Sequence, residues 1–255
     1  MSDGPSAPAY DRRLLTPKVS TIDLDGMAGR VLFPSLEQGP WLPVERFAES
    51  RAVGEPASPD PHPHRQEEVV NYVLSGRMRR TGPGIPEARL EAGSVSRLTA
   101  RGTLTHDVQP SPGSAARWIS IMTRLPPETP PGPPPFEETG TARAVELDEG
   151  VRRANLVGAQ SPLPSLAGLE LADLTIPRGS TYRAQVGAYR RTVVYVVDGS
   201  GVVETRPMAA GAGLLAENLD ELRFRADSDY RVLLATVPTP GPSAGPGASD
   251  RSSAP

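Results

Sequence analysis

The run EVVNYVLSGRMRR (residues 68–80) is rich in β-branched and aromatic residues and is interrupted by a Ser-Gly pair, a pattern typical of a β-hairpin. A second run of this kind, RRTVVYVVDGSGVVETR (residues 190–206), turns at an Asp-Gly pair. The two turn glycines are Gly76 and Gly199, which lie 199 − 76 = 123 residues apart. Self-similarity at a fixed offset predicts that one antiparallel unit has been duplicated.

The segments that follow each hairpin repeat as well. An Ala-Gly turn comes next in both halves, at Gly93 and at Gly211, with an offset of 211 − 93 = 118. Each turn is followed by a further apolar run, ARWISIMTRL (residues 116–125) and DYRVLLATV (residues 229–237). Regular short strands with glycine turns favour jelly rolls, which fold two sheets face to face. We therefore expect an all-β protein of two tandem jelly-roll barrels, with short helices only at residues 44–50 and 147–156.

Segments rich in proline, glycine and serine divide the chain, because they cannot bury enough apolar surface to order themselves. The mid-chain segment LPPETPPGPPPFEETG is expected to be an extended connector between the barrels. The predicted organisation is a disordered tail (residues 1–12), an N-terminal barrel with a histidine site (13–124), a Pro-rich linker (125–140), a C-terminal barrel without metal ligands (141–237) and a second disordered tail (238–255).

Composition excludes several classes of function. The 255 residues carry a formal net charge of −3. The chain therefore lacks the excess of basic residues that is typical of proteins that bind nucleic acid. The absence of cysteine excludes disulfides, thiolate metal sites and cysteine nucleophiles. The N-terminal residues lack the apolar core of a signal peptide, and the longest apolar runs are too short to cross a bilayer. We expect a cytoplasmic protein with no membrane association.

The chain has three histidines, and their spacing indicates a metal site. His62 and His64 are two residues apart, so they share one face if the segment is extended, and the proline between them favours extension. His106 follows the Ala-Gly turn, on a strand that a jelly roll can place beside the first. Three imidazoles at a barrel mouth make a facial metal site with open positions. The alternative is an exposed His-Pro-His loop and an unrelated surface histidine.

The second half of the chain is an internal control for this hypothesis, because it contains no histidine. An offset of 123 carries His62 and His64 onto Gln185 and Gly187. All three histidines therefore fall in one repeat, at strand positions that a metal requires. The second barrel is predicted to be a structural or docking copy with no metal site.

The histidine segments resemble the pirin family of bicupins. HPHRQEEVVNYVLSG (residues 62–76) is similar to the family's His-Pro-His-Arg strand with its Tyr-Val-Leu-x-Gly ending, and LTARGTLTH (residues 98–106) is similar to its Thr-Ala-Gly-x-Gly-Ile-x-His. The resemblance spans residues 16–237 and implies two cupin barrels with iron or a related metal in the first. It implies that His62, His64 and His106 are metal ligands. Some relatives are quercetinase-type dioxygenases, and others are regulators that bind transcription factors.

The chain departs from the family pattern after His106. The family completes its ligand set with a glutamate two residues later, where this chain has Val108. Val108 shares a face with His106, so we expect it to line the pocket beside the metal. Asp107 and Gln109 are further candidates for the substrate pocket, although each would need a bulge to turn its side chain inward. Three neutral imidazoles leave a divalent site at net +2, which favours anionic ligands and strengthens Lewis acidity, but the lost carboxylate also weakens metal affinity.

Two further positions near the histidines bear on the site. Glu68 is a candidate catalytic residue, as a general base or as a partner that orients a histidine. The alternative for Glu68 is an ion pair with an arginine such as Arg77 or Arg79. The pair Gln66-Glu67 replaces the family's Gly-aromatic pair.

These features predict a metal-dependent enzyme that acts on a small aromatic or polyketide-like enolizable substrate, as a quercetinase-type dioxygenase or as a cyclase or isomerase of secondary metabolism. The expected cofactor is a divalent metal, with iron first and Zn, Ni, Cu and Mn as alternatives, or no metal at all. The competing hypotheses are a non-catalytic regulator that binds a protein partner and a metal-free barrel that uses acid and base groups.

Overall fold

The computed structural model describes residues 13–24, 27–33, 44–53, 61–130, 132, 136–141, 143–161 and 163–239. The predicted tails, residues 1–12 and nearly all of 238–255, lie outside the described residues. Among the residues described, no helix has the length and apolar composition that a membrane span requires.

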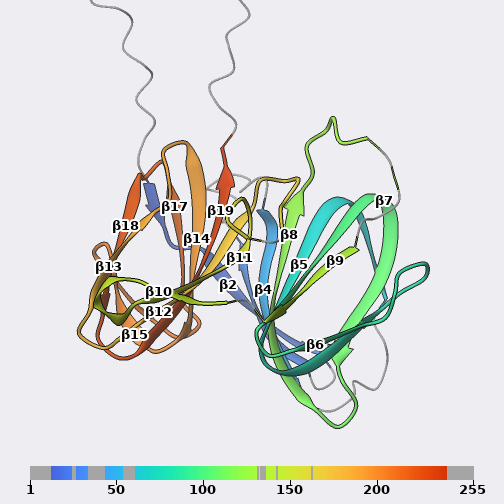
Figure 1. Ribbon diagram of the computed structural model, residues 1–255, viewed down its shortest axis with the longest axis horizontal. Coiled ribbons are helices and arrows are strands. Elements are labelled where there is room, and N and C mark those ends of the chain that lie inside the picture. The colour runs from blue at the N-terminus through green and yellow to red at the C-terminus, as the bar shows by residue number, and fades with distance from the viewer. Residues whose placement is uncertain are drawn as a thin grey trace, which may run out of the picture.

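The N-terminal half forms one eight-stranded sheet that curls into a barrel (Figure 1). Two long strands, β5 and β7, dominate it. The predicted hairpin at Ser75-Gly76 is wrong, because residues 68–80 belong to the continuous strand β5, whose two parts pair with other strands and not with each other. The strands are β2 (Lys18–Leu24), β3 (Met27–Phe33), β4 (Val44–Val53), β8 (Ala115–Arg124), β5 (His62–Thr81), β7 (Ser94–Pro110) and β9 (Phe136–Thr141) in spatial order, with β6 (Ala88–Glu91) paired to β5.

The C-terminal half is a second barrel of two sheets, which lies beside the first in Figure 1. Its seven-stranded sheet has the order β1 (Arg13–Leu15), β17 (Gly213–Glu217), β14 (Arg190–Asp198), β19 (Tyr230–Pro238), β12 (Glu170–Ile176), β11 (Arg152–Val157) and β10 (Val145–Glu146). Its four-stranded sheet has the order β13 (Thr181–Gln185), β18 (Glu221–Ala226), β15 (Ser200–Val203) and β16 (Arg206–Ala209).

Matching hydrogen bonds confirm the duplication. In the first barrel the Gly93 amide donates to the Val73 carbonyl at 2.8 Å, and in the second the Gly211 amide donates to the Val196 carbonyl at 2.8 Å. Val196 lies 123 residues after Val73, and Gly211 lies 118 residues after Gly93. Both offsets are those that the sequence repeat predicts.

The glycines at the two bends, Gly76 and Gly199, are equivalent for a steric reason. Gly76 and Gly199 have φ angles of 76° and 81°, which side chains rarely tolerate. A Cβ atom on Gly76 would lie 1.8 Å from the carbonyl oxygen of Ala115, and one on Gly199 would lie 1.9 Å from that of Asp229. Each barrel therefore requires glycine where the closing strand crosses this bend. The predicted hairpin at Asp198-Gly199 is wrong as well, because β14 and β15, on either side of Gly199, lie in different sheets and do not pair with each other.

Both helix predictions were wrong. Residues 44–50 belong to β4, whose backbone pairs with β3 on one side and β8 on the other. Residues 147–156 form a short 3₁₀ turn (Asp148–Gly150) and then β11, which pairs with β12. Pairing with two neighbouring strands outweighs the weak local helix propensity of these segments.

Strand pairing also refines the domain limits. β1 pairs with β17, so the first described strand belongs to the sheet of the C-terminal barrel, although the predicted limit placed residue 13 in the N-terminal one. β9, in the Pro-rich segment, pairs with β7 and extends the N-terminal sheet. The division of the chain at residues 125–140 otherwise stays a prediction.

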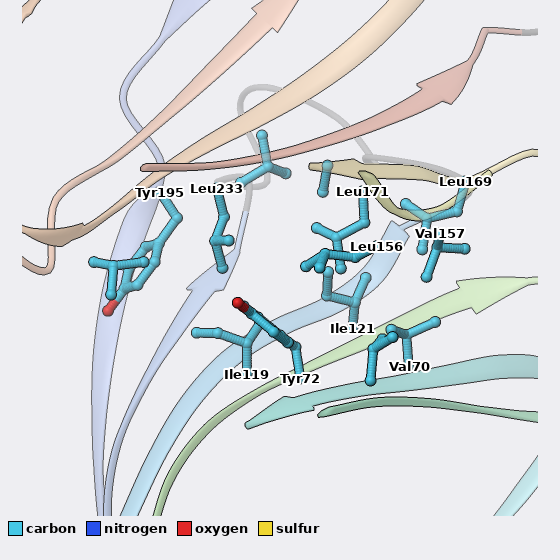
Figure 2. Close-up of a cluster of buried hydrophobic side chains, with 14 of the residues drawn as sticks. Val70, Tyr72, Ile119, Ile121, Leu156, Val157, Leu169, Leu171, Tyr195 and Leu233 are labelled. Atoms are coloured by element: carbon cyan, nitrogen blue, oxygen red, sulfur yellow. The ribbon is translucent and has the colours of Figure 1, made fainter. Parts of the chain in front are cut away.

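The two barrels meet through a shared apolar core, which Figure 2 shows. Strands β5 and β8 contribute one side of it, and strands of the C-terminal sheet contribute the other. Its labelled members are Val70, Tyr72, Ile119, Ile121, Leu156, Val157, Leu169, Leu171, Tyr195 and Leu233. Because this cluster is continuous across both halves, the barrels pack as one body.

A polar triad is buried at the edge of this interface. The Tyr72 hydroxyl donates to Asp173 Oδ2 at 2.6 Å, and Arg231 Nη2 donates to the same oxygen at 2.7 Å and to the Tyr72 oxygen at 3.1 Å. Burial and the Asp173 carboxylate raise the pKa of the Tyr72 hydroxyl, so it stays protonated and donates. The triad joins the first barrel to β12 and β19 of the second.

Candidate metal centre

Strands β5 and β7 bring the three histidines together. His62 and His106 are register partners across these strands, and His64 lies two residues further along β5. The three ring centroids are 4.8–4.9 Å apart, and one possible ligand atom from each residue lies within 4.8 Å of the others. His64 and His106 are 4% and 1% exposed, so this convergence lies inside the barrel wall.

The distance between two of the ring nitrogens fits coordination of one ion. His64 Nε2 and His106 Nε2 are 3.0 Å apart. Two nitrogens that each lie about 2.1 Å from one metal, at a right angle, are separated by about 3.0 Å. Three neutral imidazoles are ligands that suit Fe, Ni, Zn and Cu.

The facing nitrogens limit the tautomers of the site. Without a metal, one of the two facing Nε2 atoms must carry a hydrogen and donate it to the other. The buried Nδ1 of His106 has no hydrogen-bond partner in either tautomer. A bound cation would take the place of that hydrogen, so that both Nε2 atoms could present their lone pairs to it.

The electrostatic environment keeps His106 neutral. Burial, the largest cause, and the charges of His62, His64 and Arg80 together lower its pKa to about 3. Arg80 is fully buried, and its Nη2 donates to the Pro86 carbonyl at 3.2 Å. A neutral imidazole is the form that binds metal, so His106 is ready to ligate at neutral pH.

Val108 faces the apolar interior of the N-terminal barrel. Arg80 is its register partner on β5, and its side chain packs against a cluster formed by Val73, Met78, Leu90, Ala116 and Trp118. An apolar side chain therefore stands two residues beyond His106, where the family places a glutamate. That Val108 lines a substrate pocket stays a prediction.

Asp107 and Gln109 are buried, and Asp107 does not belong to the group of clustered ligand atoms. Gln109 Nε2 donates to Asp107 Oδ2 at 2.9 Å, so the two side chains satisfy each other. The structure therefore shows no contact between these two residues and the histidines among its described hydrogen bonds.

Glu68 has a different position from the one expected of a catalytic residue. Its fully buried carboxylate accepts hydrogen bonds from the Ser165 hydroxyl and, at 2.9 and 3.2 Å, from the Leu166 and Ala167 amides. Arg97 Nη1 lies 3.9 Å away. These contacts hold a loop of the C-terminal half against the first barrel, and the catalytic role of Glu68 stays a prediction.

The carboxylate that contacts a histidine is that of Glu67, which was not among the predicted site residues. Its Oε2 lies 2.9 Å from His64 Nδ1. Residues three apart in a regular strand face opposite sides, so strand parity argues against this contact. However, Gln66 has a φ of 54°, and the register with β7 shifts between Arg65 and Glu67. This Gln66 bulge turns Glu67 toward the side of His64.

The second barrel has an aromatic pair in the place of two histidines. In the first barrel His62 pairs with His106, and at the corresponding position of the second Tyr182 pairs with Phe224 across β13 and β18. The ring centroids of this aromatic pair are 6.5 Å apart. Ala184, two residues beyond Tyr182, holds the place of the remaining histidine. Aromatic and aliphatic side chains therefore fill this position, and none of the three can ligate a metal as an imidazole does.

This correspondence corrects the expected equivalents, Gln185 and Gly187. The offset between His62 and Tyr182 is 182 − 62 = 120, while the offset between Gly76 and Gly199 is 123. The second repeat therefore has three more residues between these points, in the loop that separates β13 from β14 where β5 runs on without a break.

Comparison with known proteins agrees with this architecture. No family model matches the chain. A pirin-like protein of Caulobacter vibrioides is 26% identical over 204 residues, which cover 76% of this chain and 74% of that protein. A Pseudomonas aeruginosa protein, named as a candidate quercetin 2,3-dioxygenase, is 28% identical over 221 residues, which cover 79% and 76% of the two chains.

Solved structures extend the likeness to the whole fold. The Escherichia coli pirin YhhW, solved in complex with nickel(II), superposes with a TM-score of 0.76 at 16% identity, covering 89% of this chain and all of that one (100%). Such low identity shows the fold alone. Together with the repeated barrels, it confirms the expected fold class of two tandem cupin barrels.

Proposed function

Since the chain is a pirin-like protein of two cupin barrels, we propose that it is a metal-dependent enzyme that acts on a small aromatic or polyketide-like enolizable substrate. The reaction is a dioxygenation of the quercetinase type, or a cyclisation or isomerisation in secondary metabolism. The observation that carries the proposal is the convergence of His62, His64 and His106 on one point. The relatives named for quercetin 2,3-dioxygenase activity support the substrate class.

The residues of the site define what it can bind. His62, His64 and His106 would hold the metal, with iron as the first candidate and nickel, which the YhhW complex contains, as the second. A divalent metal there supplies Lewis acidity and positions for substrate oxygens or O₂. Three neutral ligands do not balance the +2 charge of a divalent metal. The site would therefore favour an enolate or phenolate over a neutral substrate.

Arg80 reinforces the preference for an anion. It is a fully buried cation, and its charge reaches His106 strongly enough to lower the pKa of that imidazole. Val108, the register partner of Arg80 on β7, adds an apolar surface two residues from His106. A planar substrate with anionic oxygens at one edge and an apolar body would suit both features.

The remaining parts of the proposal follow from the sequence. We place the protein in the cytoplasm, with a small-molecule substrate, no nucleic acid and no membrane partner. The second candidate function is a regulator that binds a protein partner. The apolar interior of the C-terminal barrel favours a supporting or docking role for that half.

The test is reconstitution of the full chain under anaerobic conditions with Fe(II), Ni(II), Co(II) or Mn(II), followed by quercetin and related flavonols. Loss of flavonol absorbance with matching O₂ uptake is the expected result for a dioxygenase. A parallel assay without O₂, on enolizable polyketide-like substrates, detects cyclisation or isomerisation.

The control is a triple variant, His62→Ala with His64→Ala and His106→Ala, which should lose both metal and turnover. Stoichiometric metal without turnover on any substrate would instead favour the regulator. Turnover that persists in the triple variant would overturn the metal-dependent mechanism.

A further inference from the structure

The contact between His64 and Glu67 determines which nitrogen of His64 is free. A carboxylate only accepts hydrogen bonds, so at 2.9 Å from Glu67 Oε2 the Nδ1 atom must carry the hydrogen. The lone pair of the neutral ring then lies on Nε2, the atom that faces His106 Nε2 at 3.0 Å. Glu67 therefore presents His64 in the tautomer that a metal between the two rings needs.

Glu67 does not belong to the ligand group itself. The clustered ligand atoms come from the three histidines only, among the residues that the structure describes. Glu67 binds the side of the His64 ring that faces away from His106. Its carboxylate thus acts on the site through His64 and leaves the open coordination positions free.

The environment of Glu67 makes this contact strong. The Glu67 side chain is 19% exposed and that of His64 is 3% exposed, so water screens the pair poorly. A buried carboxylate–imidazole hydrogen bond raises the basicity of the ring and fixes its orientation. Both effects strengthen the bond from Nε2 to a metal.

The charge of Glu67 also bears on the missing glutamate. With Val108 in place of a ligand, three neutral imidazoles leave a divalent ion at +2. The Glu67 carboxylate supplies one negative charge next to the ligand set without filling a coordination position. In this arrangement the Glu67 charge partly balances the divalent ion, and the coordination position that a glutamate would fill stays open.

Resting on the proposed metal function, we propose that Glu67 is a positioning residue of the site. It orients His64 and replaces, from outside the ligand set, the negative charge that Val108 removes. The arrangement depends on the Gln66 bulge, which brings a side chain three residues from His64 onto its side of the strand.

The test is metal affinity of the full-length protein with Ni(II) and Co(II), measured by calorimetry for Glu67→Gln. This variant keeps the shape of the side chain and removes its charge. We expect the Kd to rise about 10- to 100-fold, the typical effect of losing such a partner. The visible ligand-field bands of the Co(II) form should shift, because the electron donation of His64 changes. A merely structural role would leave those bands in place.

A matched control is Glu217→Gln in the second barrel. Glu217 is a carboxylate of similar burial, 12% exposed, that pairs with Arg191 at 2.8 Å. It should leave the Kd and the Co(II) spectrum unchanged. If Glu67→Gln does not fold, Glu67→Asp, which keeps the charge but shortens the reach, replaces it with a smaller expected rise in Kd.

A second prediction separates charge from shape. Adding Val108→Glu to Glu67→Gln should recover the lost affinity, and the gain from Val108→Glu should be larger in this background than in the wild type. Equal affinity and equal spectra for Glu67→Gln and the wild type would overturn the role of Glu67 and leave the metal function intact. A wild type that binds neither ion would overturn both.

Discussion

The two barrels share a backbone plan and differ in what fills them. The second barrel contains one continuous apolar cluster, in which Phe224, Leu222 and Val194 are almost completely buried. In the described part of the first barrel, the interior apolar residues form two small clusters. Buried polar side chains lie in the same barrel, and they include His64, His106, Arg80, Asp107 and Gln109.

This contrast separates stability from function. A continuous apolar core maximises the hydrophobic contribution to folding, whereas every buried polar group adds a desolvation cost unless it is paired. The first barrel retains an orphaned His106 nitrogen and a buried cation. We infer that the second barrel and the shared interface stabilise the chain, so that the first can keep a polar interior for ligand binding.

The largest expected effect comes from matched substitutions at equivalent positions. Phe224→Ala should lower the free energy of unfolding by about 3–5 kcal/mol, because it opens a cavity in the apolar core, and should leave metal affinity unchanged. His106→Ala should lower it by less than about 2 kcal/mol and abolish metal binding. Urea unfolding and metal analysis of both variants check this. Similar stability losses in the two would break the comparison.

Next in size is the joint between the barrels. Asp173→Ala leaves Arg231 without its bidentate partner and Tyr72 without its acceptor. Because Arg231 is partly exposed, we expect a loss of about 2–3 kcal/mol, below the value for a fully buried pair. Denaturant unfolding measures it, with Asp198→Ala, whose carboxylate pairs with Arg117 but is 56% exposed, as the control. An equal effect at both sites would contradict the importance of the triad.

Val108→Glu should move the first barrel toward a four-ligand site. In the metal-free protein the new carboxylate lies against apolar side chains, so stability should fall by about 2 kcal/mol. With metal the carboxylate can ligate, and affinity for Fe(II) or Ni(II) should rise. Calorimetric titration of both forms is the measurement. Unchanged affinity would mean that Val108 does not face the metal position.

Acid should act through His106 in the metal-free protein. Its pKa is about 3 when folded and about 6.5 when unfolded, so between these values the unfolded chain binds more protons. The free energy of unfolding should therefore fall as the pH falls from 6.5 to 3, by at most about 1.4 kcal/mol per pH unit from this group. His106→Asn should flatten that part of the profile. Identical profiles would show that His106 titrates normally.

The smallest effect concerns the Gln66 bulge. Gln66→Gly should stabilise the protein by about 1 kcal/mol, since glycine adopts the positive φ without strain, and should retain metal affinity. Gln66→Val disfavours that φ and should weaken metal binding by separating Glu67 from His64. Thermal unfolding and Ni(II) titration distinguish the two variants. Tighter binding in the valine variant would contradict the bulge's role.

Much of this could be predicted from the sequence because it depends on local patterns. The repeated strand-and-glycine pattern around Gly76 and Gly199 indicated duplication, although neither glycine forms the hairpin that was predicted. Steric contact with a crossing strand explains why glycine stands there. The alternation of side chains on a strand placed His62 and His64 on one face. The expected jelly-roll order of strands placed His106 beside them, and the family resemblance agreed with it.

Two contacts could not be predicted from the sequence, for different physical reasons, and the first is that parity holds only while a strand is regular. The Gln66 bulge put Glu67 at the histidines, a contact that alternation argues against. Contacts between the two barrels decided the position of Glu68, and its loop partners lie about a hundred residues away. Neither fact has a signal in the local sequence, although the glycine that the family has at position 66 hinted at an unusual backbone.

The most direct test of the account is an anaerobic calorimetric titration of the full chain with Fe(II) or Ni(II), beside the triple variant of His62, His64 and His106. The account predicts one ion per wild-type chain and none per variant chain, with the variant still folded by circular dichroism. Equal binding by both proteins, or none by the wild type, would contradict the claim that these three histidines form a metal site.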